Sequence, residues 1–418
     1  MAIRHGIIYQ RVSLSPAWLN RRVATLCKDL QQDGIKAGDT LITDASPLPT
    51  VLLTYAAERL DCRLASFDPN WLETQREGFI SAARIRCSPT HPDIRLALAT
   101  SGSSGQPKAV LLTENAIHSS ARAVCQRLEI SANDMWLCCL PLFHIGGLAI
   151  LHRCAVSGAS LLLHDKFDPL RVLQDIQRYH VTCISLVPSM LQRLLEAQDC
   201  SPLPKSLRIA LIGGAALPEK LAEQAIKSGW PICPTYGMTE TCSMVAVCYP
   251  PPKSWMAGQA GQALEHLDIG FGEEQRILVR GNSIMEGYAY PDSPFIPQPS
   301  GVWLESGDAG YLDTQGQLVV QGRLDNIIIS GGENIHPRQV EESLLQHPCV
   351  ENVMVGSKPD ATWGETLVAA FTGQIEETEL ASWSKQHLHG AFRPRHFIKL
   401  DSLPLNAQHK PDYHLLFS

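Results

Sequence analysis

The 418-residue chain lacks the features of several protein classes. It has no excess of positive charge, because its 35 lysines and arginines are outnumbered by 42 aspartates and glutamates. The formal net charge of −7 gives no electrostatic reason to expect a nucleic acid or an anionic membrane as a partner. The sequence also contains no internal repeat, no low-complexity tract and no long charge run.

Cysteine is present without a recognisable metal or redox pattern. The 13 cysteines are scattered, and the adjacent Cys138 and Cys139 fit neither zinc nor thioredoxin-like spacing. We therefore expect buried free thiols in a reducing compartment.

Segments for export or membrane insertion are missing too. The first residues contain no apolar core long enough for a secretory signal. The most apolar region, residues 136–152, is interrupted by Pro141, His144 and a glycine pair. It is shorter than the roughly 20 uninterrupted apolar residues that cross a bilayer. We expect a cytoplasmic protein without an integral membrane segment.

What is present is an alternation of short apolar runs and amphipathic stretches. Hydrophobic residues make up 44% of the chain, which is ordinary for a protein with a sizeable core. Strands are predicted at 40–45, 62–68, 159–165, 181–188 and 207–214. Helices are predicted at 48–60, 169–180, 189–198 and 217–229. This alternation favours an α/β fold with layers of parallel strands and helices.

The pattern changes twice further along the chain. From about residue 257, short β segments at 275–281, 302–306, 310–313 and 317–325 predict a β-rich subdomain. After Asp325, strands at 326–330, 350–357 and 365–373 and a helix at 337–347 predict a small α+β domain. We therefore expect a large domain at 1–323, with the β-rich subdomain at about 257–323, a hinge at 324–325 and a small domain at 326–418.

Residues 99–110, ATSGSSGQPKAV, contain a run of small residues followed by a lysine. Such a loop leaves backbone N–H groups uncovered, and its hydroxyls are further donors. Lys108 adds a positive charge, so the parts are those of a phosphate cradle. The spacing is not that of a Walker loop, G-x-x-x-x-G-K-[ST]. An ordinary solvent loop remains the alternative.

Further motifs follow this loop in order. They are PLFHIGG (141–147), LIGGAALP (211–218), TYGMTE (235–240), ESGDAGYLD (305–313), QGRLDN (321–326), SGGENIHPRQVE (330–341) and LPLNAQHK (403–410). The set resembles the adenylate-forming superfamily of acyl- and aryl-CoA ligases, carrier-loading adenylation domains and luciferases, over residues 95–412. The resemblance implies a small carboxyl-terminal domain that is mobile. It also implies that an acid is joined to the AMP moiety of ATP, with Mg²⁺, and is then transferred to a thiol such as coenzyme A.

The resemblance assigns residues to the nucleotide. The residues assigned to the phosphates of ATP are Thr100, Ser101, Gly102, Ser103, Ser104, Gly105 and Lys108. Glu240 is the implied Mg²⁺ ligand, since magnesium favours one or two carboxylates plus phosphates. Thr239 is expected to donate to the α-phosphate, and Tyr236, next to Gly237, to stack on adenine. Asp308 is expected to hold the ribose, and Arg323 the ribose or a phosphate. A core aromatic for Tyr236 and surface turns for Asp308 and Arg323 are the alternatives.

Other positions are assigned to the acid and to domain motion. His144 resembles the gate between the acyl pocket and the thiol channel, although a packed histidine is the alternative. Gly213, Gly214 and Ala215 are expected to form a wall for a flat acyl group. Lys410 matches the superfamily's mobile catalytic lysine, although its setting, NAQHKP, departs from the usual N-x-x-G-K. Asp325 matches the hinge.

The motifs look most like the branch of o-succinylbenzoate–CoA ligases of menaquinone and phylloquinone synthesis. Arg153 matches an arginine that helps to hold a substrate carboxylate there. The chemistry agrees, since an arginine in the apolar run GGLAILHRCAVSG is costly unless an anion lies near it. A helix arginine that reaches solvent is the alternative. Ser185, Ser189 and Thr241 are further pocket candidates.

Three rival functions remain open. A coumarate-like or medium-chain acyl-CoA ligase would not need a charge at Arg153. A carrier-loading adenylation domain would normally accompany a carrier domain, which is not visible here. A non-catalytic nucleotide-binding protein would explain the unusual surroundings of Lys410.

Overall fold

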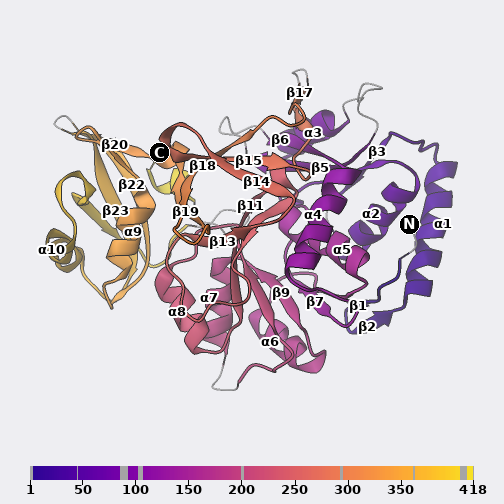
Figure 1. Cartoon of the computed structure of the whole chain (residues 1–418), viewed down its shortest axis with the longest axis horizontal. Helices are drawn as coiled ribbons and strands as arrows, with labels where there is room; N and C mark the ends of the chain where they lie inside the picture. The colour runs from indigo at the N-terminus through magenta and orange to yellow at the C-terminus, as the bar shows by residue number, and fades with distance from the viewer. Residues whose placement is uncertain are drawn as a thin grey trace.

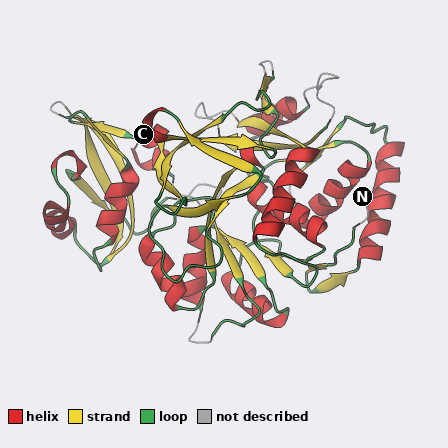
Figure 2. Ribbon diagram, in the orientation of Figure 1, coloured by secondary structure: helices red, strands yellow, loops and turns green. Residues whose placement is uncertain are grey.

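The structure is a computed structural model that describes residues 3–44, 46–84, 93–101, 107–198, 202–291, 295–360, 363–404 and 412–417. Its amino-terminal helices lie at one end of the molecule, and the unit that follows residue 326 lies at the other (Figure 1). Helices pack beside the strands throughout (Figure 2).

One sheet has six strands among the described residues, in the order β17-β16-β6-β5-β4-β3. The strands are β3 (Thr40–Thr43), β4 (Arg63–Ser66), β5 (Ile94–Ser101), β6 (Pro107–Thr113), β16 (Gly287–Ala289) and β17 (Ile296–Pro297). The first three run parallel, with α2 (Pro47–Arg59) and α3 (Glu73–Ala83) in the connections between them. After β6, which is antiparallel to β5, α4 (Glu114–Arg127) begins where the Thr113 hydroxyl accepts a hydrogen bond from the Ala116 N–H.

The second sheet has 13 strands among the described residues. Its parallel half comprises β1 (Ile7–Tyr9), β7 (Met135–Cys138), β8 (Ser160–Leu163), β9 (Cys183–Leu186), β10 (Ile209–Ile212) and β11 (Ile232–Met238). Its antiparallel part comprises β2 (Val12–Leu14), β12 (Ser243–Val247), β13 (Gln259–Ala263), β14 (Leu267–Phe271), β15 (Arg276–Gly281), β18 (Leu304–Leu312) and β19 (Leu318–Arg323). Strands β9 and β10 are buried at every position, because a covered parallel sheet excludes solvent from both faces.

Four of the described helices connect strands of this second sheet. They are α5 (Ile145–Ser157), α6 (Pro169–Arg178), α7 (Pro188–Ala197) and α8 (Glu219–Lys227), whereas α1 (Pro16–Gln32) leads from β2 to β3 of the six-stranded sheet. The predicted α/β fold is therefore confirmed, with sheets that are mixed rather than wholly parallel.

The expected β-rich region between 257 and 323 contributes to both sheets. Its strands β16 and β17 extend the six-stranded sheet, and the others extend the second sheet. The prediction of separate segments at 302–306 and 310–313 is wrong, because both belong to β18. Gly310 does not end that strand. A Cβ there would lie 2.5 Å from the Val319 carbonyl oxygen, so this glycine permits close approach of β19.

The carboxyl-terminal unit is α+β, as predicted. It comprises β20 (Ile328–Ser330), β21 (Glu333–Ile335), α9 (Pro337–Leu345), β22 (Val350–Asp360), β23 (Gly364–Gly373), α10 (Glu377–His387), β24 (His396–Lys399) and α11 (Tyr413–Phe417). The first strand begins later than predicted, because residues 324–326 form a 3₁₀ turn. A separate apolar cluster that includes Val340, Leu344 and Phe371 forms its core.

The expectation of buried thiols holds for most of the described cysteines. All of them are free, and all except Cys349 are buried. In the part of the chain that the structure describes, no helix is both long enough and apolar enough to span a bilayer.

Candidate functional site

The site forms where β11 ends and the chain turns sharply into β12. A β-bulge separates Tyr236 from Gly237 in this pairing. A Cβ on Gly237 would lie 1.8 Å from the Ser243 carbonyl oxygen, so only glycine allows this approach. The 3₁₀ turn η1 (Thr239–Thr241) follows directly. The strand end therefore projects Tyr236, Thr239 and Glu240 within one short segment.

The residues predicted to bind the ribose and adenine come together from three strands, β11, β18 and β19. The Tyr236 hydroxyl donates a hydrogen bond to Asp308 Oδ2 at 2.8 Å. Asp308 in β18 lies opposite Arg323 in β19, and Arg323 Nε lies 3.9 Å from Asp308 Oδ1. Burial raises the pKa of the Asp308 carboxyl above its usual value. The arrangement places a buried carboxylate beside an aromatic ring and a guanidinium, which are suitable partners for a nucleoside.

A second group of contacts joins Lys108, which is expected to bind phosphate, to the expected magnesium ligand Glu240. The Lys108 ammonium lies 3.6 Å from the ring centroid of Tyr288. The Tyr288 hydroxyl donates a hydrogen bond to Glu240 Oε1 at 2.9 Å. Burial lowers the pKa of Lys108 and raises that of Tyr288. Tyr288 therefore contacts both the Lys108 ammonium and the Glu240 carboxylate and sets their relative positions.

Tyr288 was not predicted from the sequence. It reaches the site because β16 pairs antiparallel with β6, which sets Tyr288 opposite Val110. The available signal was the alternation of aromatic residues in GYAY, at positions 288 and 290. Alternation predicts a strand, but it does not identify the strand's partner.

The residues fit a magnesium ion that arrives with the nucleotide. No group of three or more His, Cys, Asp or Glu side chains is arranged to hold a metal ion in the described ranges. Glu240 instead offers one carboxylate near a phosphate-binding lysine, and magnesium commonly combines one or two carboxylates with substrate phosphates.

Much of the small-residue loop lies outside the described residues. This applies to Gly102, Ser103, Ser104, Gly105 and also to the distant Lys410, and only the backbone of Ser101 is described. Thr100 precedes the loop in β5, opposite Lys108 in β6. Its hydroxyl oxygen is buried and has no hydrogen-bond partner among the described residues. A phosphate oxygen would satisfy this hydroxyl.

Gly213, Gly214 and Ala215 follow β10 at the carboxyl end of the parallel strands. A Cβ on Gly213 would lie 2.5 Å from the Thr235 hydroxyl, and Gly214 has φ of +80°. Both positions therefore require glycine. Ligands of open α/β sheets commonly bind at this edge, which agrees with the expected wall.

Arg153 does not reach solvent, so the alternative of a solvated helix arginine is wrong. Its side chain is in α5, and the residue is only 3% exposed. Nη2 donates to the Ser243 hydroxyl at 3.0 Å, and the guanidinium lies 5.4 Å from the Trp136 ring centroid. Nε has no hydrogen-bond partner, and no ion pair includes Arg153, among the described residues. Burial lowers its pKa to about 10.

A small pocket adjoins this guanidinium, and we call it the acyl pocket. It is lined by Ile117, Ser120, Ala121, Ile145, Ala149, His152, Arg153 and Cys242. The lining is mainly apolar, with one buried cation. Because a buried guanidinium without a carboxylate is costly, the pocket is suited to an acid that carries an anionic group away from the nucleotide.

The remaining pocket candidates differ in what they contact. His144 precedes α5, and its ring centroid lies 4.4 Å from that of Phe143. Ser189 is half-buried in α7. The buried Thr241 hydroxyl instead bonds the Met238 and Ser243 carbonyl oxygens, and Ser185 accepts a hydrogen bond from Trp136. The structure therefore places Thr241 in the turn and Ser185 beneath Trp136.

The expected hinge lies beside the nucleotide residues. Asp325 belongs to the turn at 324–326, and its carboxylate lies 2.5 Å from Arg323 Nη2. Among the described residues, side chains of both units make polar contacts to the other unit. Lys220 donates to the Val350 carbonyl oxygen at 3.1 Å, and Arg338 donates to that of Val320 at 3.3 Å.

Residues 12–289 match the AMP-binding enzyme family, and residues 339–410 match the AMP-binding enzyme C-terminal domain. A 2-succinylbenzoate–CoA ligase of Bacillus velezensis is 34% identical over 374 residues, which cover 87% of this chain and 76% of that protein.

Two solved structures of Bacillus subtilis o-succinylbenzoate CoA synthetase are also similar. One is a complex with the acyl-adenylate intermediate OSB-AMP. It has a TM-score of 0.87 and 29% identity, and the match covers 98% of this chain and 94% of that one. The other is a complex with ATP and magnesium ion. It has a TM-score of 0.85 and 29% identity, with coverage of 97% and 94%.

Proposed function

The chain belongs to the AMP-binding enzyme family, and we propose that it is the ATP-dependent ligase that joins 2-succinylbenzoate to coenzyme A. In the first step a carboxylate of the acid attacks the α-phosphorus of ATP, which forms the acyl-adenylate and releases pyrophosphate. In the second, the thiol of coenzyme A attacks the acyl carbonyl and AMP leaves. The product is a thioester for menaquinone biosynthesis.

The observation that supports 2-succinylbenzoate as the substrate is the burial of Arg153. 2-Succinylbenzoate has two carboxylates, and only one is activated. The other needs a cationic or hydrogen-bonding partner when it enters an apolar pocket. Arg153 offers an unpartnered Nε and no competing ion pair among the described residues. A coumarate-like or medium-chain acid would leave this guanidinium buried without a counter-ion.

The nucleotide is bound by the groups at the ends of β11, β18 and β19. Tyr236 faces the adenine, while Asp308 and Arg323 hold the ribose. Thr100, the small-residue loop and Lys108 bind the β- and γ-phosphates, and Thr239 donates to the α-phosphate. Glu240 would hold Mg²⁺, which supplies positive charge to the phosphates. Charge neutralisation dominates here, because an anionic nucleophile must approach a polyanion.

The second step uses a different set of residues. His144 gates the passage from the acyl pocket to the thiol, and Asp325 is the hinge about which the small domain turns. We also propose a cytoplasmic location, supported by the buried free cysteines.

The proposed reaction is tested by the release of pyrophosphate from ATP. We expect release to require 2-succinylbenzoate and to produce its CoA thioester when coenzyme A is added. Benzoate and cinnamate derivatives should support turnover at least about tenfold less well, because they leave Arg153 unpaired. Equal turnover with these acids would contradict the substrate assignment. Binding of ATP without any acid-dependent release would favour the non-catalytic alternative.

Arg153→Leu should weaken binding of the dicarboxylate selectively. Loss of a charge-assisted hydrogen bond of about 2 kcal/mol predicts a KM for 2-succinylbenzoate raised about 30-fold, with little change in the KM for ATP. Steady-state kinetics at saturating ATP measure this effect. Arg193→Leu is a matched control, because Arg193 in α7 contacts Phe167 outside the pocket. An unchanged KM in Arg153→Leu would remove Arg153 from the substrate site.

A further inference from the structure

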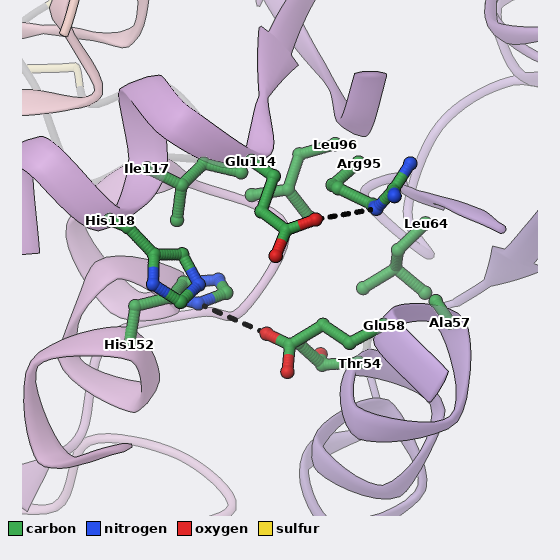
Figure 3. A pocket seen from close by; sticks show the side chains of 10 residues that line it. All are labelled: Thr54, Ala57, Glu58, Leu64, Arg95, Leu96, Glu114, Ile117, His118 and His152. Atoms are coloured by element: carbon green, nitrogen blue, oxygen red, sulfur yellow. Dashed lines mark ion pairs between the residues drawn. The ribbon is translucent and has the colours of Figure 1, made fainter. Parts of the chain in front are cut away.

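A second cavity lies beside the acyl pocket, and its wall carries ionisable side chains from four elements (Figure 3). We call it the ionisable cavity. Its charged or titratable residues are Glu58 of α2, Arg95 of β5, Glu114 and His118 of α4, and His152 of α5. None of them has a role in the nucleotide site described above. The two cavities share Ile117 and His152, so the imidazole of His152 lines both.

One nitrogen of His152 is paired, and the other is not. Nδ1 lies 3.6 Å from Oε1 of Glu58. Figure 3 marks this ion pair with a dashed line. Nε2 is buried and has no hydrogen-bond partner among the described residues. His152 is only 5% exposed, and the Glu58 side chain 15%. An unsatisfied nitrogen at this depth is costly, which indicates that a ligand group completes its hydrogen bonding.

Burial moves the pKa values of the two groups in opposite directions, so that below about pH 7 Glu58 is the group that holds a proton. Burial raises the pKa of the Glu58 carboxyl to about 7 and lowers the pKa of His152 to about 3. The imidazole is therefore neutral near neutral pH, and Glu58 gains a proton as the pH falls through about 7. The other titratable or charged groups around the pair are Tyr55, Arg59, Arg95, Glu114, His118 and Arg153.

The protonation state of Glu58 selects the tautomer of His152. A neutral imidazole has one N–H donor and one acceptor nitrogen. An ionised Glu58 carboxylate, 3.6 Å from Nδ1, attracts the imidazole hydrogen to that nitrogen, which leaves a lone pair on Nε2. A neutral Glu58 carboxyl that approaches by a few tenths of an ångström can donate its O–H to Nδ1, which leaves the hydrogen on Nε2. Only the second arrangement lets Nε2 donate to an anionic ligand.

We propose that Glu58 is a positioning residue that acts through His152 to determine whether the acyl pocket offers an Nε2–H donor to the non-reacting carboxylate of the acid. The inference rests on the proposed function, because the acid must carry such a carboxylate. Arg153 adjoins His152 in the same pocket lining, and its Nε is also unpartnered. When Glu58 is protonated, the Nε2–H of His152 is a hydrogen-bond donor that acts together with the Arg153 guanidinium. When Glu58 is ionised, His152 Nε2 presents a lone pair and Glu58 a negative charge, and both repel the non-reacting carboxylate.

The test is the pH dependence of KM for 2-succinylbenzoate at saturating Mg-ATP. Both carboxylates of the acid stay ionised above about pH 6, since ordinary carboxyl pKa values lie near 4. We expect KM to be low below pH 7 and to rise about tenfold as the pH increases to about 8.5, with kcat changed less than about twofold. This separation of KM from kcat would not follow from a merely structural role.

Two variants and a matched control locate the effect. Glu58→Gln cannot ionise, and its amide can donate to Nδ1 at every pH, so KM should remain low across the range. His152→Phe should give a high KM at every pH. Glu114→Gln removes another carboxylate of the ionisable cavity, but one that is 51% exposed and paired with Arg95. Its KM should still rise with pH, with the midpoint moved to lower pH, because the charge of Glu114 contributes to the raised pKa of Glu58.

An analogue with hydrogen in place of the non-reacting carboxylate supplies a second measurement on the wild-type protein. Its KM should not follow the titration of Glu58. Parallel rises for the acid and the analogue would contradict the inference, as would a wild-type KM that does not change with pH. A rise that persists in Glu58→Gln would contradict it too. These results leave the proposed function intact, whereas absence of 2-succinylbenzoate-dependent thioester at every pH would overturn that function itself.

Discussion

Replacing Lys410 by alanine should lower the rate of acyl-adenylate formation by about 10²- to 10³-fold, the range expected when a positioned electrostatic group is removed from a charged transition state. Lys410 lies outside the described residues, and its role comes from the match of LPLNAQHK to the superfamily's mobile lysine. The first step needs positive charge at the attacking carboxylate and the α-phosphate. The second step does not need this charge, because a neutral acyl carbonyl is attacked.

The two half-reactions therefore respond differently to this change. Lys410→Ala should convert a pre-formed acyl-adenylate to the CoA thioester within about twofold of the wild-type rate, while pyrophosphate release is nearly lost. Binding of ATP should be largely retained. Lys399→Ala is a suitable control, because Lys399 lies in the same domain and pairs with the exposed Glu376. An equal loss in both half-reactions would contradict separate poses of the small domain. An unaffected first step would mean that the His409 and Pro411 departures have displaced the function of this lysine.

Glu240→Gln should have the second large effect. The change keeps an oxygen that can accept the Tyr288 hydrogen bond, but it removes the negative charge expected to hold Mg²⁺. We expect kcat for adenylation to fall about 10²-fold or more and the Mg²⁺ requirement to rise. Titration of pyrophosphate release with Mg²⁺ measures both quantities.

Tyr288→Phe distinguishes the charge of Glu240 from its position. It removes the hydroxyl that donates to Glu240 and keeps the ring beneath the Lys108 ammonium. Loss of one hydrogen bond of about 1 kcal/mol predicts a decrease of less than about tenfold. If Glu240→Gln is no more harmful than Tyr288→Phe, the carboxylate is a structural partner of Tyr288 and not a metal ligand.

The alternation of strands and helices was sufficient to predict the α/β fold, and the order of the motifs predicted a nucleotide site at residues that the structure brings together. Arg323 lies beside Asp308 because β18 pairs with β19, and the Tyr236 hydroxyl reaches Asp308 although β12 and β13 lie between β11 and β19 in the strand order. Motif order identified these residues without any knowledge of strand pairing. Arg153 was also identified as a candidate from the sequence alone, because a charged residue within an apolar run is visible there.

The features that the sequence did not reveal depend on long-range pairing. Tyr288 contacts Lys108 only because β16 adds to β6, and Glu58 meets His152 only because α2 packs near α5. Thr241 is next to the expected metal ligand but turns its hydroxyl into the backbone of its own turn. The sequence predicted separate segments at 302–306 and 310–313, although β18 runs from one to the other and Gly310 permits close approach of β19. In each case the local residues are compatible with several environments, and tertiary packing selects one.

The most direct test of the account is a crystal structure of the protein with a non-hydrolysable adenylate analogue of 2-succinylbenzoate. We predict that the adenine contacts Tyr236, that the ribose contacts Asp308 and that the non-reacting carboxylate pairs with Arg153. An analogue that binds elsewhere, or one whose free carboxylate lies away from Arg153, would contradict it.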